Sequence, residues 1–224
     1  MEAVIKVGGS LAENPAQLKA LCTQLSELSR KYAITVVPGG GRFADVVRDF
    51  DRRFALSSML AHRMAILAMD QYGLALTQLI PNSVATYLLS KARQLAETGA
   101  APIFLPSRLM FKGDPLENSW DVTSDSIAAY VASRLGAAKL LLATDVDGIF
   151  TDDPKQYADV ELIERLSAEE LLRLNKRTSV DRHLPKLLLE SPIKCYVVNG
   201  NYPERVAAIL AGQHTICTLI APGK

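Results

Sequence analysis

The sequence predicts an α/β protein in which a buried, doubly wound parallel sheet lies between two layers of helices. Short β-branched runs alternate along the chain with longer segments of helical spacing, which is typical of this fold class. Of the 224 residues, 49% are hydrophobic and 22% are charged, an ordinary composition for a globular core. We expect strands at residues 3–7, 33–37, 102–105, 139–143, 193–198 and 215–220.

Helical patterns fill the gaps between these strands. Asn14 and Pro15 supply a cap and a first-turn proline for a helix in which leucine recurs at positions 18, 21, 25 and 28. Further helices are expected at residues 43–51, 57–73 and 83–98, from Thr123, from Ser167, and at residues 181–190. The segment 57–73 carries an apolar stripe that we interpret as core packing: Leu60, Met64, Leu67 and Ala68.

A turn-rich stretch lies near the middle of the chain, at Gly113, Asp114 and Pro115. Glycine and proline in such a cluster favour a boundary between two structural units. We therefore expect two lobes of one continuous fold, residues 1–118 and residues 119–224.

The charge balance and the cysteines exclude several classes of protein. Lys and Arg number 25 against 24 Asp and Glu, without the basic excess expected of a nucleic-acid-binding protein. Three widely spaced cysteines with no CxxC pair fit neither a disulfide framework nor a zinc site, so we expect a reducing cytoplasm. No apolar stretch reaches the roughly 18 residues of a membrane span, and the N-terminus does not resemble a signal peptide.

Two glycine-rich loops follow the first two expected strands, where ligands of doubly wound sheets usually bind. The first reads Lys6-Val7-Gly8-Gly9-Ser10 and the second Pro38-Gly39-Gly40-Gly41-Arg42. Backbones without Cβ atoms can approach an anion closely, and N–H groups at a helix start add a positive dipole. Either loop alone could be a tight turn, but two in corresponding positions predict paired phosphate sites and phosphoryl transfer.

Other common site motifs are absent from the sequence. There is no P-loop GxxxxGK[ST], no dinucleotide-binding GxGxxG after either strand and no GxSxG nucleophile elbow. Asp145-Val146-Asp147-Gly148 lacks the further ligands of a calcium-binding EF-hand. His62, His183 and His214 show no metal-ligand spacing, so a dedicated protein metal site is not expected.

Two polar segments in the second half are further candidates. Asp125 lies at the start of an amphipathic helix, where its carboxylate would serve either as an ordinary cap or as a functional group. The loop from Thr144 to Pro154 follows the strand at 139–143 and carries many side chains that form hydrogen bonds. It is either a plain surface loop or one wall of a nucleotide pocket.

Taken in order, these motifs resemble the amino acid kinase family over nearly the whole chain. The resemblance rests on Lys6 to Ser10, Pro38 to Gly41, Thr123-Ser124-Asp125, residues 143–154 and Lys186. It implies a three-layer αβα sandwich around a mainly parallel sheet of roughly eight strands. The lobe 1–118 would then hold a small anionic acceptor and the lobe 119–224 would hold ATP.

The resemblance also implies a role for individual residues. Lys6 would stabilise the transferring phosphoryl group, Lys186 the leaving phosphates, and Asp125 would hold both lysines in place, with no general base needed for an anionic acceptor. Mg²⁺ would be held largely by ATP oxygens, and a homo-oligomer is expected. The residues expected to contact the acceptor or the phosphates are Gly8, Gly9, Ser10, Gly39, Gly40, Gly41, Arg42 and Arg63. Those expected to contact ATP are Thr144, Asp145, Asp147, Gly148, Phe150 and Asp153.

One segment departs from the pattern of many family members. Residues 178–186 lack the usual Gly-Gly-Met before the second lysine, and the chain is too short for an added regulatory domain. Together with residues 120–126, this segment is similar to the subgroup that phosphorylates an aminomethylfuran alcohol phosphate to a diphosphate in methanofuran-type cofactor biosynthesis. Arg42, His62 and Arg63 would contact the acceptor phosphate, or else Arg42 caps its loop and the other two decorate a helix face.

Three alternatives stay open at this point. The chain could phosphorylate UMP, as uridylate kinases do, or the carboxylate of an amino acid. It could also be a non-catalytic ATP-binding storage or sensor protein on the same fold. The presence of Lys6, Asp125 and Lys186 favours catalysis, because a binding protein has no need of such charge-neutralising groups.

Overall fold

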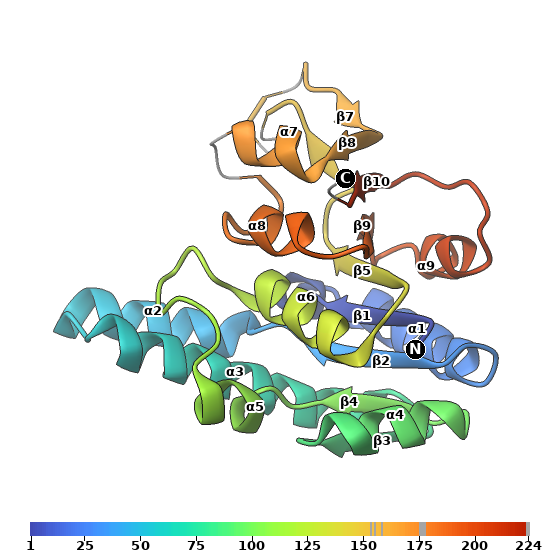
Figure 1. Ribbon diagram of the computed structural model, residues 1–224, viewed down its shortest axis with the longest axis horizontal. Helices are drawn as coiled ribbons and strands as arrows, with labels where there is room; N and C mark the ends of the chain where they lie inside the picture. The colour runs from blue at the N-terminus through green and yellow to red at the C-terminus, as the bar shows by residue number, and fades with distance from the viewer. Residues whose placement is uncertain (153, 155, 158, 175–177, 223–224) are drawn as a thin grey trace.

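One eight-stranded sheet runs through the computed structural model, which describes residues 1–222 except 153, 155, 158 and 175–177 (Figure 1). The strand order is β3–β4–β2–β1–β5–β9–β10–β8. The strands are β1 (Ala3–Val7), β2 (Ile34–Pro38), β3 (Ser83–Thr86), β4 (Ala101–Phe104), β5 (Lys139–Thr144), β8 (Arg165–Ser167), β9 (Lys194–Asn199) and β10 (Thr218–Ala221). Two short strands, β6 (Ile149–Phe150) and β7 (Leu162–Ile163), pair separately as an antiparallel ribbon.

The sheet is parallel except where β10 runs antiparallel to β9. β1 lies at its centre, with Lys6 opposite Val37 of β2 on one side and Leu142 of β5 on the other. The carboxyl ends of β1, β2 and β5 therefore meet at one edge of the sheet, which brings the loops that follow them together. The predicted αβα sandwich on a mainly parallel sheet of about eight strands is confirmed.

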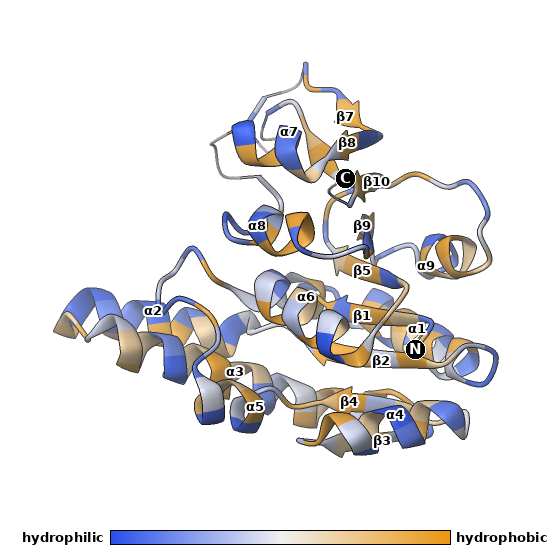
Figure 2. Ribbon diagram, viewed as in Figure 1, coloured by the Kyte–Doolittle hydropathy of each residue, from blue (hydrophilic) through white to orange (hydrophobic). Residues whose placement is uncertain are grey.

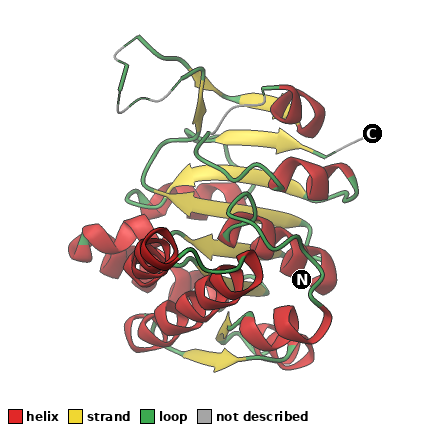
Figure 3. Cartoon of the chain, turned by 90° about the vertical axis from the view of Figure 1, so that its left-hand side faces the viewer, coloured by secondary structure: helices red, strands yellow, loops and turns green. Residues whose placement is uncertain are grey.

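Helices cover both faces of the sheet (Figure 3). Along β1, Ile5 and Val7 pack into the apolar cluster that includes α1, whereas Val4 packs into the cluster that includes α6. The helices are α1 (Pro15–Ser29), α2 (Gly41–Phe54), α3 (Ser58–Leu79), α4 (Leu89–Glu97), α5 (Ser107–Gly113), α6 (Ser124–Leu135), α7 (Ala168–Arg173), α8 (Leu184–Leu189) and α9 (Pro203–Leu210), and a 3₁₀ turn, η1 (Gly9–Glu13), follows β1. Because side chains alternate along a strand, Lys6 faces the same layer as α6.

Local capping signals at the starts of α1 and α7 behave as their chemistry predicts. The Asn14 side chain accepts a hydrogen bond from Gln17 N, and Pro15 occupies the first turn of α1. Ser167 and Glu170 form a reciprocal capping box at the start of α7. Among the described residues, no helix is long and apolar enough to cross a membrane.

The expected helix at residues 83–98 is wrong in its first part. Ser83–Thr86 is strand β3, which pairs in parallel with β4, and α4 begins only at Leu89. Thr86 Oγ1 accepts a hydrogen bond from Leu88 N, and this turn separates the strand from the helix. A four-residue edge strand is too short to show its period in the sequence.

The apolar stripe predicted for the core is only partly buried. Ala68 is buried, but Leu60 is 48% and Leu67 44% exposed on α3. Helical spacing identifies one face of a helix, and it cannot say whether that face meets the sheet or solvent. The interpretation of Leu60 and Leu67 as core residues is therefore wrong.

Candidate active site

Lys6 and Asp125 form a buried ion pair at the centre of the sheet. Lys6 Nζ lies 2.7 Å from Asp125 Oδ1, and both side chains are less than a tenth exposed. Lys6 comes from β1 and Asp125 from the first turn of α6, which packs over that strand. Buried charges are tolerated when they are paired, so the Asp125 carboxylate allows the Lys6 ammonium group to remain charged although it is shielded from water.

Asp181 contacts the carboxylate oxygen of Asp125 that does not face Lys6. Its backbone N–H donates a hydrogen bond to Asp125 Oδ2 at 3.2 Å. Burial is the largest influence on Asp125 and raises its pKa, with a smaller rise from the charge of Asp181, while Lys6 lowers it. Burial and the Lys6 charge thus act in opposite directions on the pKa of Asp125. The position of its carboxylate also depends on Asp181, which lies outside α6.

The carboxylate of Asp181 is saturated with hydrogen bonds. Oδ2 accepts from Thr123 N, Thr123 Oγ1 and Ser126 N, each at 2.9 Å, and Oδ1 accepts from Ser126 Oγ at 2.6 Å and Leu184 N at 2.8 Å. One side chain therefore ties the start of α6 to the start of α8, the helix that carries Lys186.

The two glycine loops touch each other beside this ion pair. A Cβ atom on Gly9 would collide with the backbone of Gly41, and one on Gly39 would lie 2.7 Å from Gly9 N. Gly41 also has a φ of 53°, in the left-handed region that glycine tolerates best. Contact between the loops therefore requires glycine on both sides, which explains the two runs seen in the sequence.

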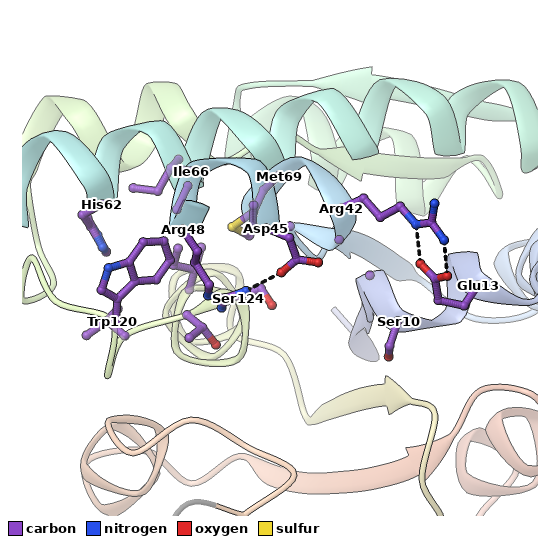
Figure 4. Close-up of a pocket in the computed structure, with 18 residues that line it drawn as sticks. Ser10, Glu13, Arg42, Asp45, Arg48, His62, Ile66, Met69, Trp120 and Ser124 are labelled. Atoms are coloured by element: carbon purple, nitrogen blue, oxygen red, sulfur yellow. Dashed lines mark hydrogen bonds and ion pairs between the residues drawn. The ribbon is translucent and has the colours of Figure 1, made fainter. Parts of the chain in front are cut away.

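A pocket of about 460 Å³ opens beside the glycine loops (Figure 4). Gly9, Ser10, Gly40 and Gly41 line one part of it, and apolar side chains of α3 and α6, among them Ile66, Met69 and Ile127, line another. Residues from both predicted lobes contribute, because Trp120 to Ile127 belong to the second half of the chain. The volume lies in the range of small-ligand sites.

Charged side chains at the pocket are already paired. Arg42 forms a bidentate ion pair with Glu13, in which Arg42 Nε lies 2.6 Å from Glu13 Oε1. Arg48 Nη1 lies 2.9 Å from Asp45 Oδ1, and its guanidinium lies 4.9 Å from the ring of Trp120. Arg42, predicted to contact the acceptor, is thus at the pocket, with its side chain 79% exposed.

His62 is buried at the pocket wall rather than decorating a helix face. The residue is 5% exposed, and its Nε2 has no hydrogen-bond partner among the described residues. Arg63, by contrast, is not among the residues that line the pocket, and its guanidinium lies 5.6 Å from the ring of Phe111. The structure therefore separates His62 from Arg63, although the two are adjacent in sequence.

The predicted ATP loop meets the first glycine loop at one hydrogen bond. Ser10 Oγ donates to Asp145 Oδ1 at 3.0 Å, and Thr144 Oγ1 donates to the same oxygen at 3.3 Å. Asp147 accepts from Asn199 Nδ2 at 3.0 Å and forms an ion pair with Arg205 at 2.6 Å. Hydrogen bonds and an ion pair therefore connect this loop to η1, β5, β9 and α9.

Other predicted residues of this loop have different surroundings. A Cβ on Gly148 would collide with Thr218 and would lie 2.7 Å from Leu162 Cδ1, so this glycine permits close packing. Phe150 belongs to β6 and pairs with Leu162 of β7. Asp153 lies outside the described residues.

Lys186 stands apart from the Lys6–Asp125 pair. It is exposed on the six-residue helix α8, and the described pockets do not include it among their lining residues. The expectation that Asp125 holds both lysines thus has a structural counterpart for Lys6 alone.

Comparison with known proteins places this geometry in a family. The sequence model of the amino acid kinase family matches residues 1–199, which include the Lys6–Asp125 pair, both glycine loops and the loop from Thr144 to Pro154. The chain belongs to the amino acid kinase family. The chain is accordingly a phosphotransferase that uses ATP.

Individual relatives cover the chain almost end to end. It is 37% identical over 97% of its length, and 96% of the relative's, to the [5-(aminomethyl)furan-3-yl]methyl phosphate kinase of Methanocaldococcus jannaschii. It is 31% identical to the uridylate kinase of Thermofilum pendens, with 97% of each chain covered. Among solved structures, the uridylate kinase of Archaeoglobus fulgidus superposes with a TM-score of 0.79 at 23% identity, covering 99% of this chain and 100% of that one.

Sequence reasoning missed several residues that the structure places at the site. Asp181, Trp120, Asn199 and Arg205 were not singled out as site residues. Asp181 precedes two further polar residues in the segment 181–183 that departs from the family pattern, and that departure was the only available signal. The five hydrogen bonds to its carboxylate come from Thr123, Ser126 and Leu184. The first two residues lie 58 and 55 positions away in sequence, which no local pattern reveals.

Proposed function

We propose that this member of the amino acid kinase family transfers the γ-phosphoryl group of ATP to the phosphate of an aromatic alcohol phosphate, producing a diphosphate. The proposed acceptor is [5-(aminomethyl)furan-3-yl]methyl phosphate, hereafter the furan phosphate, which the name of the M. jannaschii relative gives for that protein. One observation carries the proposal: the Lys6 ammonium group, held 2.7 Å from Asp125, lies beside glycine loops that open into a pocket lined by both polar and apolar side chains.

The ion pair and the loops supply what phosphoryl transfer needs. The reaction depends on in-line positioning and on neutralising charge spread over the transferred oxygens. In the proposal, Lys6 neutralises that charge while Asp125 fixes the direction of its ammonium group. Backbone N–H groups of Gly9, Gly40 and Gly41 donate to the acceptor phosphate and to the transferred group. The expected donor Gly8 is not used, because its N–H already donates to Ala143 O at 2.8 Å. An acceptor that is already an anion needs no general base.

The acceptor is proposed to lie mainly against residues 1–118, and ATP against residues 119–224. Thr144, Asp145, Asp147 and Phe150 would line the nucleotide side, supported by the hydrogen bond that joins Asp145 to Ser10. Lys186 would meet the leaving phosphates from α8, whose first residue is linked to Asp125 through Asp181.

Mg²⁺ is proposed to accompany ATP. Among the described residues, no three His, Cys, Asp or Glu side chains gather to hold a metal ion, and the Asp125 carboxylate faces Lys6. The donor set therefore fits a cation carried by ATP phosphate oxygens, where it would add to the charge neutralisation supplied by Lys6.

Uridylate kinases among the relatives favour UMP as a second candidate acceptor. ADP release from Mg-ATP by the purified chain separates the candidates. We expect turnover with the furan phosphate and little with UMP, isopentenyl phosphate, glutamate, acetylglutamate or carbamate. Turnover with UMP alone would replace the proposal by the second candidate, and turnover with an amino acid would indicate carboxylate phosphorylation. ATP binding with no ADP from any acceptor would favour a storage or sensor protein.

A homo-oligomer is proposed to form through α2 and α3. Both helices expose large apolar side chains, among them Val46 and Phe54 on α2 and Leu67 and Leu74 on α3. Hydrophobic and hydrophilic stretches alternate along the ribbons of both helices (Figure 2). The exposed residues of α3 are Ser58, Met59, Leu60, Leu67, Gln71, Leu74, Ala75 and Gln78, and none of them ionises. An uncharged face meets a copy of itself without repulsion, which suits a twofold interface.

The cysteines support the proposed reducing compartment. Cys22, Cys195 and Cys217 are all free thiols in the structure, and burial raises the pKa of each. A buried, protonated thiol is chemically inert and places no demand on an oxidising environment.

A further inference from the structure

The wall of the acceptor pocket holds a buried polar atom that the Lys6–Asp125 machinery does not use. His62 of α3 is 5% exposed, lines the pocket, and leaves Nε2 without a partner among the described residues. A buried nitrogen without a hydrogen bond costs about 1–3 kcal/mol, so such groups are retained where something else supplies the partner. In a pocket, that partner is a bound molecule.

His62 lies at the end of the pocket remote from the phosphate loops. Figure 4 shows Ser10 toward one end and His62 beside Trp120 at the other, with Ile66 and Met69 between them. The acceptor phosphate must lie near Lys6 and the glycine loops for transfer to occur. His62 therefore lies at the end of the pocket away from the acceptor phosphate, which revises the hypothesis that His62 contacts that phosphate. His62 also lines a neighbouring cavity of about 150 Å³, together with Ser119 and Trp120.

The surroundings of His62 favour a neutral ring. Burial is the largest influence and lowers the pKa of His62, against smaller opposing effects of Asp114 and the Ser119 backbone. A neutral imidazole carries one lone pair that accepts hydrogen bonds. The ionised neighbour that acts on the ring is the carboxylate of Asp114. The charged side chains that line the pocket are paired with one another, Arg42 with Glu13 and Arg48 with Asp45.

We propose that His62 sets acceptor specificity: its Nε2 accepts a hydrogen bond from a primary ammonium group on the acceptor end remote from the phosphate. This inference rests on the proposed function, because the furan phosphate carries such an aminomethyl group. The pocket then matches the acceptor along its length. Glycine loops bind the phosphate, Ile66 and Met69 contact the ring, and His62 binds the amine.

Pairs of acceptors and variants test the assignment. The acceptors are the furan phosphate and its analogue with a methyl group in place of aminomethyl. We expect the unmodified chain to favour the amine by about 10- to 100-fold in kcat/KM. His62→Gln places an amide oxygen near the position of Nε2 and should keep most of this preference. His62→Asn cannot reach that position and should bring the ratio close to one, with the KM for ATP unchanged.

The two variants are matched, since each replaces the imidazole by a carboxamide in the same buried place. Equal use of both acceptors by the unmodified chain would overturn the role of His62 even if no variant folded, and would leave the proposed function standing. A full amine preference retained by His62→Asn would overturn it as well. Turnover of UMP with no turnover of either furan compound would overturn the proposed function, and the role of His62 with it.

Discussion

The backbone N–H of Asp181 donates to Oδ2 of Asp125 at 3.2 Å, on the carboxylate whose other oxygen faces Lys6. The Lys6–Asp125 pair is therefore fixed by a residue more than fifty positions away in sequence. Asp181 is itself fixed by five hydrogen bonds to its carboxylate, four of them from the start of α6. This makes Asp181 a positioning residue for Lys6, acting through Asp125.

Asp181→Asn should weaken both stability and catalysis. The amide keeps one acceptor oxygen, but its NH₂ group would face the N–H donors of Thr123 and Ser126 or of Leu184. We expect a loss of about 2–4 kcal/mol in the free energy of unfolding, measured with urea, because buried donors lose their partners. A fall in kcat larger than any rise in the KM for ATP should accompany it, because the geometry of the pair is disturbed.

Asp159→Asn is the matched control, since Asp159 is exposed in a loop of the same half of the chain. It should leave both measurements unchanged. Normal kcat in folded Asp181→Asn protein would show that the Lys6–Asp125 pair holds its geometry without Asp181.

Lys6→Met should remove turnover while leaving ATP affinity nearly intact. The change deletes the ammonium group that we propose to neutralise the transferring phosphoryl charge, and a loss of about 10²- to 10³-fold in kcat is expected for one such group. It also leaves the Asp125 carboxylate buried without its partner, which costs about 3–5 kcal/mol in stability. ADP release measures the first effect and calorimetric titration with ATP the affinity.

The double variant Lys6→Met/Asp125→Asn separates these two effects. Removing the charge of Asp125 should restore much of the stability without restoring turnover. Recovery of activity in the double variant would mean that Lys6 acts only by compensating a buried charge, and the proposed mechanism would be wrong.

Much of this architecture could be predicted from the sequence because it depends on local signals. The bounds of β1, β5 and α1 follow within one or two residues from short apolar runs and an Asn-Pro cap. The strand β3 could not be found, because four residues that range from exposed Val84 to buried Thr86 carry no clear period. The exposure of Leu67 depends on what packs against α3, which the sequence does not contain.

Some residues of the candidate site could likewise be predicted from the sequence, and others could not. Lys6, Gly9 and Asp125 lie in motifs, so residue type and spacing indicated them. His62 and Asp181 gain their importance from burial and from distant partners: the first through a nitrogen without a partner among the described residues, the second through bonds across more than fifty residues. Contacts of this kind are set by the tertiary fold.

Gly9→Ala tests whether contact between the two glycine loops matters. A methyl group there would collide with the Gly41 backbone, so the loops must separate. We expect a fall in kcat/KM for the acceptor of at least tenfold, together with a loss of stability. Gly113→Ala is the control, because a Cβ at Gly113 meets nothing within 4 Å. That variant should retain full activity and gain a few tenths of a kcal/mol. Full activity in Gly9→Ala would remove the loop contact from the mechanism.

Leu67→Glu should dissociate the proposed oligomer. Leu67 is 44% exposed at the middle of the uncharged face of α3, seven residues from both Leu60 and Leu74. A twofold interface would bring two introduced carboxylates close together in an apolar contact, at a high desolvation cost. The mass measured by light scattering after size exclusion should fall from a multiple of 24.4 kDa to 24.4 kDa itself.

Leu172→Glu, at an exposed position of α7, is the control and should leave the assembled mass unchanged. An unmodified chain that already elutes at 24.4 kDa would contradict the proposed interface.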